Sequence, residues 1–206
     1  MQFIDSLDLD RCPHCGKAHP SLLRQTSFDT EKTPGGGPIM RRWSFYECRS
    51  CGGAVAAWAY YKNGRVDSSV REYFPKIPIA DAALPDKVKS YMQQAMETIH
   101  APAGSVMLAA CAVDEMLKQR GYIDGKLYNR INQARDDHLI TPDMAEWAHE
   151  VRLDANDQRH ADMNAELPNE DDARRIVDFA RALGDILFVL PARVRRGRED
   201  ANPGEV

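Results

Sequence analysis

With 206 residues, the chain is long enough for one or two domains with a hydrophobic core. No apolar stretch reaches the length of a membrane span, and no targeting or lipidation signal is present, so we expect a soluble cytoplasmic protein without membrane contact. The net charge of −4 argues against an extensive coat of nucleic acid. Residues 1–80 hold 11 lysines and arginines against 8 acidic residues, whereas residues 81–206 hold 16 against 23, so the first part is mildly basic (+3) and the second acidic (−7).

Two Cys-x-x-Cys pairs lie near the N-terminus, and a glycine follows each pair. Four thiolates complete a tetrahedral zinc site, and the glycines tolerate the tight turns that direct backbone N–H groups at sulfur. A reducing cytosol argues against disulfides, and the βαβ context of a redox Cys-x-x-Cys motif is missing. An iron centre with the same four thiolates is the remaining alternative. We therefore predict a structural zinc ion with the ligands Cys12, Cys15, Cys48 and Cys51.

The segments beside the second cysteine pair have the alternation of short strands. The pattern predicts three strands, at residues 21–28, 39–48 and 54–61, with a loop at residues 29–38. In the middle strand Trp43 and Phe45 lie on one face and Arg42 on the other. Asn63-Gly64 is a favoured two-residue hairpin turn. These features predict a small antiparallel zinc ribbon over residues 1–65.

Basic and aromatic side chains are concentrated in the predicted ribbon, and they have two interpretations. They could form a patch for single-stranded nucleic acid, or the aromatic rings could pack the ribbon against the rest of the protein. The second interpretation is favoured, because so small a ribbon has little other core. The residues concerned are Arg41, Arg42, Trp58, Tyr60 and Tyr61.

The pattern becomes helical in the second part of the chain. Residues 66–84 contain prolines and few periodic apolar positions, which indicates a linker. Apolar residues then recur with helical spacing and predict a five-helix bundle over residues 85–192. Thr141 and Asn169 are predicted N-caps of the last two helices. The charged end, residues 193–206, is expected to be a disordered tail.

The segment from Val151 to His160 contains the candidate site of the bundle. Asn156 is a candidate N-cap, so we expect a break in the helix that lets Arg152 and His160 meet over one pocket. Arg152 would hold a phosphate with two N–H donors, and His160 would move a proton to or from a ribose hydroxyl. The structural alternative is that both side chains tie the helix junction together, with Asp154 or Asp157 as their partner.

Residues 84–194 resemble a bacterial domain of unknown function that is found alone or at the C-termini of restriction endonucleases and is grouped in the HEPN superfamily. The resemblance rests on the segments Ser105–Ala110, Leu127–Ile131 and Ile140–Pro142. It rests most on Arg152, Asn156 and His160, which match in outline an Arg-x-x-Gly-Asn-x-x-x-His motif. The resemblance implies an all-α, commonly dimeric bundle. In many members it also implies metal-independent RNA cleavage by an Arg–His motif from both protomers.

Together these features predict an α+β protein: a small antiparallel zinc-ribbon β module followed by an all-α HEPN-like helical bundle. The predicted function is that of a nucleic-acid-associated zinc protein of bacterial or phage defence or restriction. It would act as a homodimer and, if it is an enzyme, would cleave RNA without metal, with Arg152, Asn156 and His160 as catalytic residues. The alternative is a non-catalytic adaptor that binds a protein partner or a nucleotide through the bundle. The net negative charge of the bundle favours the adaptor.

Overall fold

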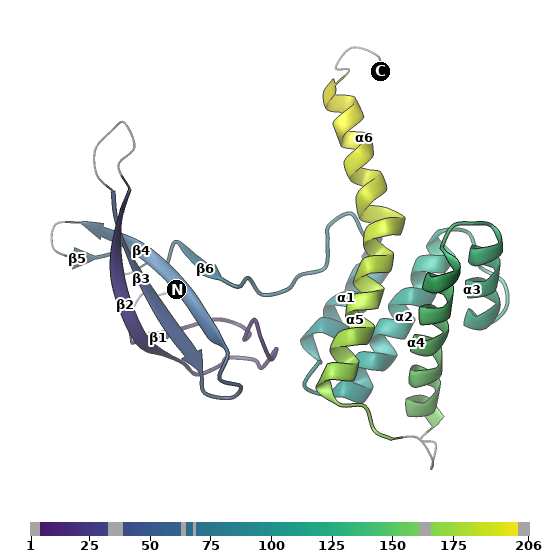
Figure 1. Cartoon of the computed structure of the whole chain (residues 1–206), viewed down its shortest axis with the longest axis horizontal. Helices are drawn as coiled ribbons and strands as arrows, with labels where there is room; N and C mark the ends of the chain where they lie inside the picture. The colour runs from purple at the N-terminus through teal and green to yellow at the C-terminus, as the bar shows by residue number, and fades with distance from the viewer. Residues whose placement is uncertain (1–4, 33–38, 63–64, 68, 161–165, 202–206) are drawn as a thin grey trace. The chain divides into compact units, whose positions relative to one another are not determined.

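The computed structural model describes residues 5–32, 39–62, 65–67, 69–160 and 166–201 of the chain. It divides into two compact units, Met1–Pro78 and Ile79–Val206. The strands all lie in the first unit and the helices in the second (Figure 1). The predicted fold class, a small antiparallel β module followed by an all-α region, is confirmed.

The first unit is one antiparallel sheet. Its strands are β1 (Ser6–Leu7), β2 (Leu22–Lys32), β3 (Ile39–Cys48), β4 (Ala54–Lys62), β5 (Arg65–Val66) and β6 (Glu72–Phe74). The order is β1-β2-β3-β4, and both β5 and β6 pair with β4. The short strand β6 lies within the segment expected to be a linker. The predicted turn at Asn63-Gly64 lies outside the described residues.

One face of this sheet forms the core of the first unit. Tyr46 of β3 and Val55, Ala57 and Ala59 of β4 are completely buried on this face. Leu22 of β2 packs with them, and so do three of the four clustered cysteines. Because successive side chains alternate across a strand, the other face of β3 carries its remaining aromatic residues, as predicted.

The second unit is built around one central helix. Its helices are α1 (Asp86–Glu97), α2 (Pro102–Gln119), α3 (Leu127–Asp136), α4 (Pro142–His160) and α5 (Glu170–Gly184). Helix α2 packs against the other four and contributes Val113 and Met116 to the core, which also contains Phe179 of α5. No helix in the described part of the chain combines the length and apolarity needed to cross a membrane.

Both predicted N-caps are present. The side chain of Thr141 accepts a hydrogen bond from the backbone N–H of Met144 at 3.2 Å. The Asn169 side chain accepts from the N–H groups of Asp171 and Asp172, and the Asp172 carboxylate accepts from the Asn169 N–H in return. These bonds satisfy orphan donors of the first turn, so the caps set where α4 and α5 begin.

The helix break predicted at Asn156 is wrong. Helix α4 is continuous from Pro142 to His160. An asparagine favours the N-cap by only about 1 kcal/mol. Here that preference is outweighed by uninterrupted helical hydrogen bonds and by the burial of Ala148 and Val151 in the core.

The segment expected to be a disordered tail is helical as far as Ala201. Helix α5 continues through a π-helical segment, η1 (Asp185–Val189), into α6 (Leu190–Ala201) (Figure 1). Pro191 would normally end a helix, because it has no N–H and its ring meets the preceding turn. The wider π turn before Pro191 provides the place where such strain is absorbed, so the helix continues.

Candidate metal centre and helical groove

The four predicted ligands meet at one point of the first unit. The sulfurs of Cys12, Cys15, Cys48 and Cys51 all lie within 4.8 Å of one another, and those of Cys12 and Cys51 are 3.9 Å apart. Zinc–sulfur bonds of about 2.3 Å in a tetrahedron place the sulfurs about 3.8 Å apart. The cluster is therefore compatible with a structural zinc site.

Each cysteine pair forms the same tight turn. The N–H of Gly16 donates to the carbonyl of Cys12 at 3.0 Å, and the N–H of Gly52 donates to that of Cys48 at 2.8 Å. Both glycines have a φ near +70°, in the left-handed region that other residues rarely adopt. The glycines after the two pairs are therefore required by the turns that bring the thiols together.

Backbone donors and neighbouring sulfurs set the protonation of the cluster. The N–H of His14 points at the sulfur of Cys12, and that of Gly53 points at the sulfur of Cys51, each at 3.4 Å. Burial opposes ionisation of Cys48, but the backbone N–H groups of Ser50 and Cys51, together with the sulfurs of Cys12 and Cys51, outweigh it and lower the pKa of Cys48 to about 7. Burial and adjacent sulfurs raise the pKa of Cys51 to about 12. Four thiolates this close need a cation to balance their charge, which fits a metal.

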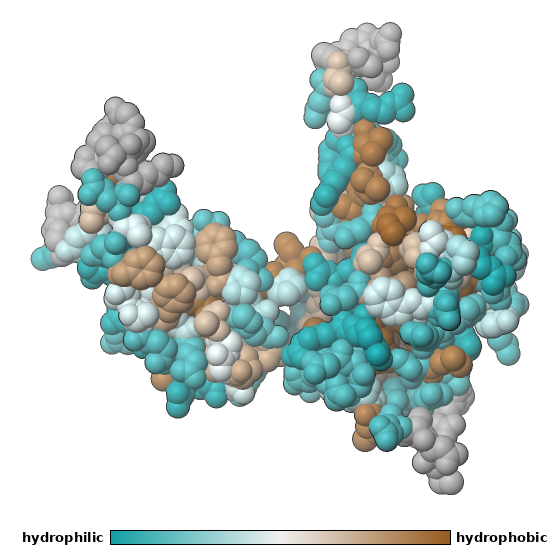
Figure 2. Space-filling model, viewed as in Figure 1, coloured by the Kyte–Doolittle hydropathy of each residue, from teal (hydrophilic) through white to brown (hydrophobic). Residues whose placement is uncertain are grey.

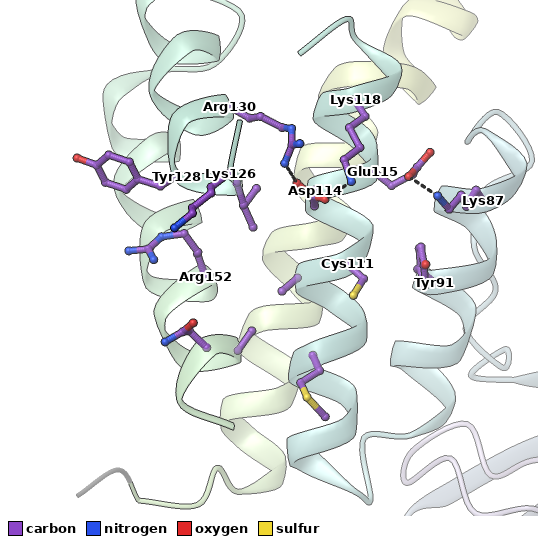
Figure 3. Close-up of a pocket in the computed structure, with 15 residues that line it drawn as sticks. Lys87, Tyr91, Cys111, Asp114, Glu115, Lys118, Lys126, Tyr128, Arg130 and Arg152 are labelled. Carbon is purple, nitrogen blue, oxygen red and sulfur yellow. Dashed lines mark hydrogen bonds and ion pairs between the residues drawn. The ribbon is translucent and has the colours of Figure 1, made fainter. Parts of the chain in front are cut away.

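The second unit contains a groove of about 820 Å³ that follows α2 (Figure 3). Helix α1 borders it on one side, and α3 and α4 border it on the other. It is lined by Lys87, Tyr91, Met107, Ala110, Cys111, Asp114, Glu115, Lys118, Lys126, Leu127, Tyr128, Arg130, Arg152, Ala155 and Asn156. Five of these are basic and two are acidic, which leaves a surplus of three positive charges in the acidic half of the chain.

Three of the five cations are held by the two carboxylates. Asp114 pairs with Arg130 at 2.7 Å and also with Lys118, while Glu115 pairs with Lys87 at 2.9 Å. Dashed lines mark these pairs in Figure 3. Hydrogen bonds from Gln119 and then Lys87 lower the pKa of Glu115, so this carboxylate is ionised at neutral pH. These pairs brace the wall of the groove and leave no carboxylate of the lining unmatched.

The opposite end of the groove is cationic and open. The guanidinium of Arg152 lies 5.4 Å from the ring centre of Tyr128, and its Nε is buried without a hydrogen-bond partner. Within the described ranges no carboxylate lies at ion-pair distance from Arg152 or Lys126. Asn156 follows one turn later on α4 and lines the same groove. This end can accept an anion without breaking an existing ion pair.

A histidine supports the ring beneath this arginine. The ring of His149 lies 4.8 Å from that of Tyr128, and its Nε2 is 3.3 Å from the amide oxygen of Asn132. Burial, and then the charges of Arg152 and Arg135, lower the pKa of His149 below its ordinary value of 6.5. His149 is therefore neutral near pH 7 and adds an aromatic surface, not a charge.

The structure brings together part of the predicted catalytic set. Arg152 and Asn156 line one groove, whereas the side chain of His160 lies outside the described residues. On the continuous α4, His160 is two turns from Arg152, about 12 Å along the axis. Asp154 was predicted as a structural partner of Arg152. Burial raises the pKa of Asp154, and the charge of Arg175 on α5 opposes this rise.

The groove also contains residues that we did not predict as part of the site. Lys126 and Tyr128 come from the start of α3, and they meet Arg152 only because α3 packs on α4. No cluster of charged residues near them in the sequence indicated that they belong to the site. The sequence pointed to this position only because Tyr128 lies in a segment that carries the family resemblance.

Most of the chain that forms the groove matches a known family of domains. The model of the family "Domain of unknown function (DUF4145)" matches residues 93–200, which is more than half of the chain. The chain belongs to this family. The DUF4145 match begins in α1 and ends in α6, and it includes all lining residues except Lys87 and Tyr91. No curated protein and no solved structure matches the chain.

Proposed function

We propose that the protein is a zinc-containing RNA-binding protein whose DUF4145 groove holds a phosphate of single-stranded RNA at Arg152. The observation that carries this proposal is the surplus of three positive charges in the groove. Residues 81–206 have a net charge of −7, so a cationic lining there is not a consequence of composition. A cleft lined by one sign of charge concentrates ligands of the opposite sign.

The chemistry at the open end suits a phosphodiester. The planar guanidinium of Arg152 can donate two parallel hydrogen bonds to phosphate oxygens. The Tyr128 ring beneath it limits its motion, so less entropy is lost on binding. Lys126 adds a second positive charge, and the Asn156 amide can contact a ribose hydroxyl or a base edge. Zinc, held by the four cysteines, would stabilise the first unit and take no part in this contact.

A second candidate function, RNA cleavage without metal, is favoured by the shared groove of Arg152 and Asn156, which have the spacing of the HEPN-like motif. The ribose 2′-hydroxyl attacks the adjacent phosphorus, the 5′-oxygen leaves, and a cyclic phosphate forms. His160 transfers the proton, and Arg152 stabilises the charge on phosphorus. Because about 12 Å of continuous helix separates the two residues, His160 would come from the second protomer of a homodimer.

The assignment to bacterial or phage defence or restriction is carried by the resemblance alone. A non-catalytic adaptor remains the rival function, and the acidic surface of the second unit outside the groove suits a protein partner. The two functions differ in what the groove binds. An RNA-binding groove requires the unpaired guanidinium of Arg152, whereas an adaptor would bind its protein partner without RNA.

Replacing Arg152 should weaken RNA binding. We expect Arg152→Gln to raise the dissociation constant for a labelled single-stranded RNA about tenfold, because a charge-assisted phosphate contact is lost. The slope of log affinity against log salt should fall by about one, as one phosphate contact disappears. Fluorescence anisotropy at several salt concentrations measures both quantities.

Arg181→Gln is the matched control for this experiment. Arg181 is exposed on α5, is outside the groove lining, and has only a 3.7 Å contact with Asp178. The Arg181→Gln variant loses the same charge from the same unit, so it should bind RNA as tightly as the native protein does. Equal weakening of RNA binding in both variants would show that overall charge causes the effect. Unchanged binding by Arg152→Gln would refute the groove as the site.

A further inference from the structure

We propose that the exposed face of the sheet in the first unit binds the unpaired bases of single-stranded nucleic acid by stacking. This proposal rests on the proposed function for the class of ligand, but its site is separate from the groove. We call the site the aromatic face. It consists of Phe28, Trp43, Phe45, Trp58, Tyr60 and Phe74.

Strand register places these rings on one side of the sheet. Phe28 of β2 is paired with Trp43 of β3, and Trp43 is paired with Trp58 of β4. Phe74 of β6 is paired with Ala56, the residue two positions before Trp58. Directly paired residues share a face, so the rings extend across four neighbouring strands. The core of the unit lies on the other face.

The rings form an almost continuous surface. The ring centres of Phe28 and Phe45 are 6.0 Å apart, those of Trp43 and Trp58 are 6.2 Å apart, and those of Trp43 and Phe74 are 6.3 Å apart. Phe28, Phe45 and Phe74 are 48%, 36% and 42% exposed. Figure 2 shows apolar side chains at the surface of this unit. Large aromatic side chains gathered on an exposed face indicate a binding surface.

Guanidinium groups are interleaved with the rings. Arg41 lies 4.4 Å above the ring of Trp58, and Arg71 lies 4.9 Å from that of Tyr60. The Nε of Arg41 is buried without a hydrogen-bond partner, and no described carboxylate lies at ion-pair distance from Arg41. Glu72, which is paired with Trp58 across the strands, contacts Lys76 at 3.6 Å. Arg41 is therefore available to a phosphate beside a stacked base.

These features favour nucleic acid over a protein partner as the occupant. Every base has a π-face, so a row of rings accepts bases in sequence, and Arg41 neutralises a phosphate that joins them. Arg71 is already paired with Asp67 at 3.0 Å. The whole unit, residues 1–78, has a surplus of three positive charges. A surface for an apolar protein partner needs neither stacked rings nor an unpaired guanidinium group such as that of Arg41.

The test replaces one exposed ring in the full-length protein and uses labelled oligouridine as the probe. Phe45→Leu keeps an apolar side chain of similar size but removes the π-face. We expect its dissociation constant to rise about fivefold or more. Phe45→Tyr keeps the ring and should bind within about twofold of the native protein. Phe28→Leu, at a second exposed ring, repeats the measurement if Phe45→Leu lowers the melting temperature.

Two further readouts distinguish this face from the groove. Stacking should quench the fluorescence of the partly exposed Trp43 when unlabelled oligouridine is added. The salt slope should stay unchanged in Phe45→Leu, because no phosphate contact is lost. Native affinity in both leucine variants, or no quenching at saturation, overturns the aromatic face and leaves the groove intact. Loss in the leucine variants with native affinity in Arg152→Gln overturns the groove instead.

Discussion

Cys48→Ser should abolish zinc binding and unfold the sheet unit while the helical unit remains folded. Zinc contributes about 10–16 kcal/mol of apparent binding free energy in small structural sites. A core the size of that in the first unit rarely supplies more than about 3–5 kcal/mol. Three of the four cysteines belong to this core, so loss of a metal bound there would also leave uncompensated polar groups inside it. The effect should therefore exceed that of any single core truncation.

Metal content and tryptophan emission together measure this effect. The native protein should retain one zinc per chain after dialysis, and Cys48→Ser should retain none. The emission of Trp43 and Trp58 should move to the wavelength of exposed indole, while far-UV circular dichroism keeps its helical signal. Cys111→Ser is the matched control, because Cys111 lies on α2 outside the cluster. Full zinc and native emission in Cys48→Ser would disprove the ligand set.

Mixing two inactive variants should restore RNA cleavage. If the reaction uses Arg152 of one protomer and His160 of the other, then Arg152→Gln and His160→Ala are each inactive as homodimers. A heterodimer of the two contains one site in which both residues are intact. After random exchange of subunits, activity should reach about a quarter of the native value, since half of the dimers carry one active site of two.

The measurement uses labelled RNA in a buffer without added divalent ions, followed by separation of the products on a gel. The same variants should still be tested for RNA binding, where His160→Ala is expected to remain close to native. Cleavage by either variant alone would exclude the shared site. Absence of cleavage by the native protein would leave RNA binding without chemistry.

Local sequence features predicted the elements of this fold well. Caps at Thr141 and Asn169 and the glycines after each cysteine pair act through neighbouring backbone groups, so the sequence reveals them directly. The continuation of α4 through Asn156 was not predicted, because tertiary burial outweighs a weak local preference. The same holds for α6, where a π turn accommodates Pro191.

The candidate sites were also predicted to different degrees, because the sequence shows local spacing directly but does not show tertiary packing. Cysteine spacing predicts the four-cysteine cluster, and the four sulfurs do lie together as expected. The charge of the groove depends on which side chains four packed helices bring together, and net charge alone suggested the opposite sign for this region. The basic and aromatic residues of the sheet were recognised, but packing was favoured for them. The register of β3 and β4 shows that most of these rings lie opposite the core.

The position of bound RNA tests the central claim most directly. Single-stranded RNA that contains 4-thiouridine can be photo-cross-linked to the full-length protein, and the attached peptides can be identified by mass spectrometry. We predict cross-links in the peptides that contain Tyr128 and Asn156, and their loss in Arg152→Gln. Cross-links confined to the arginines of α6, with none from α3 or α4, would contradict the assignment of the groove as the RNA site.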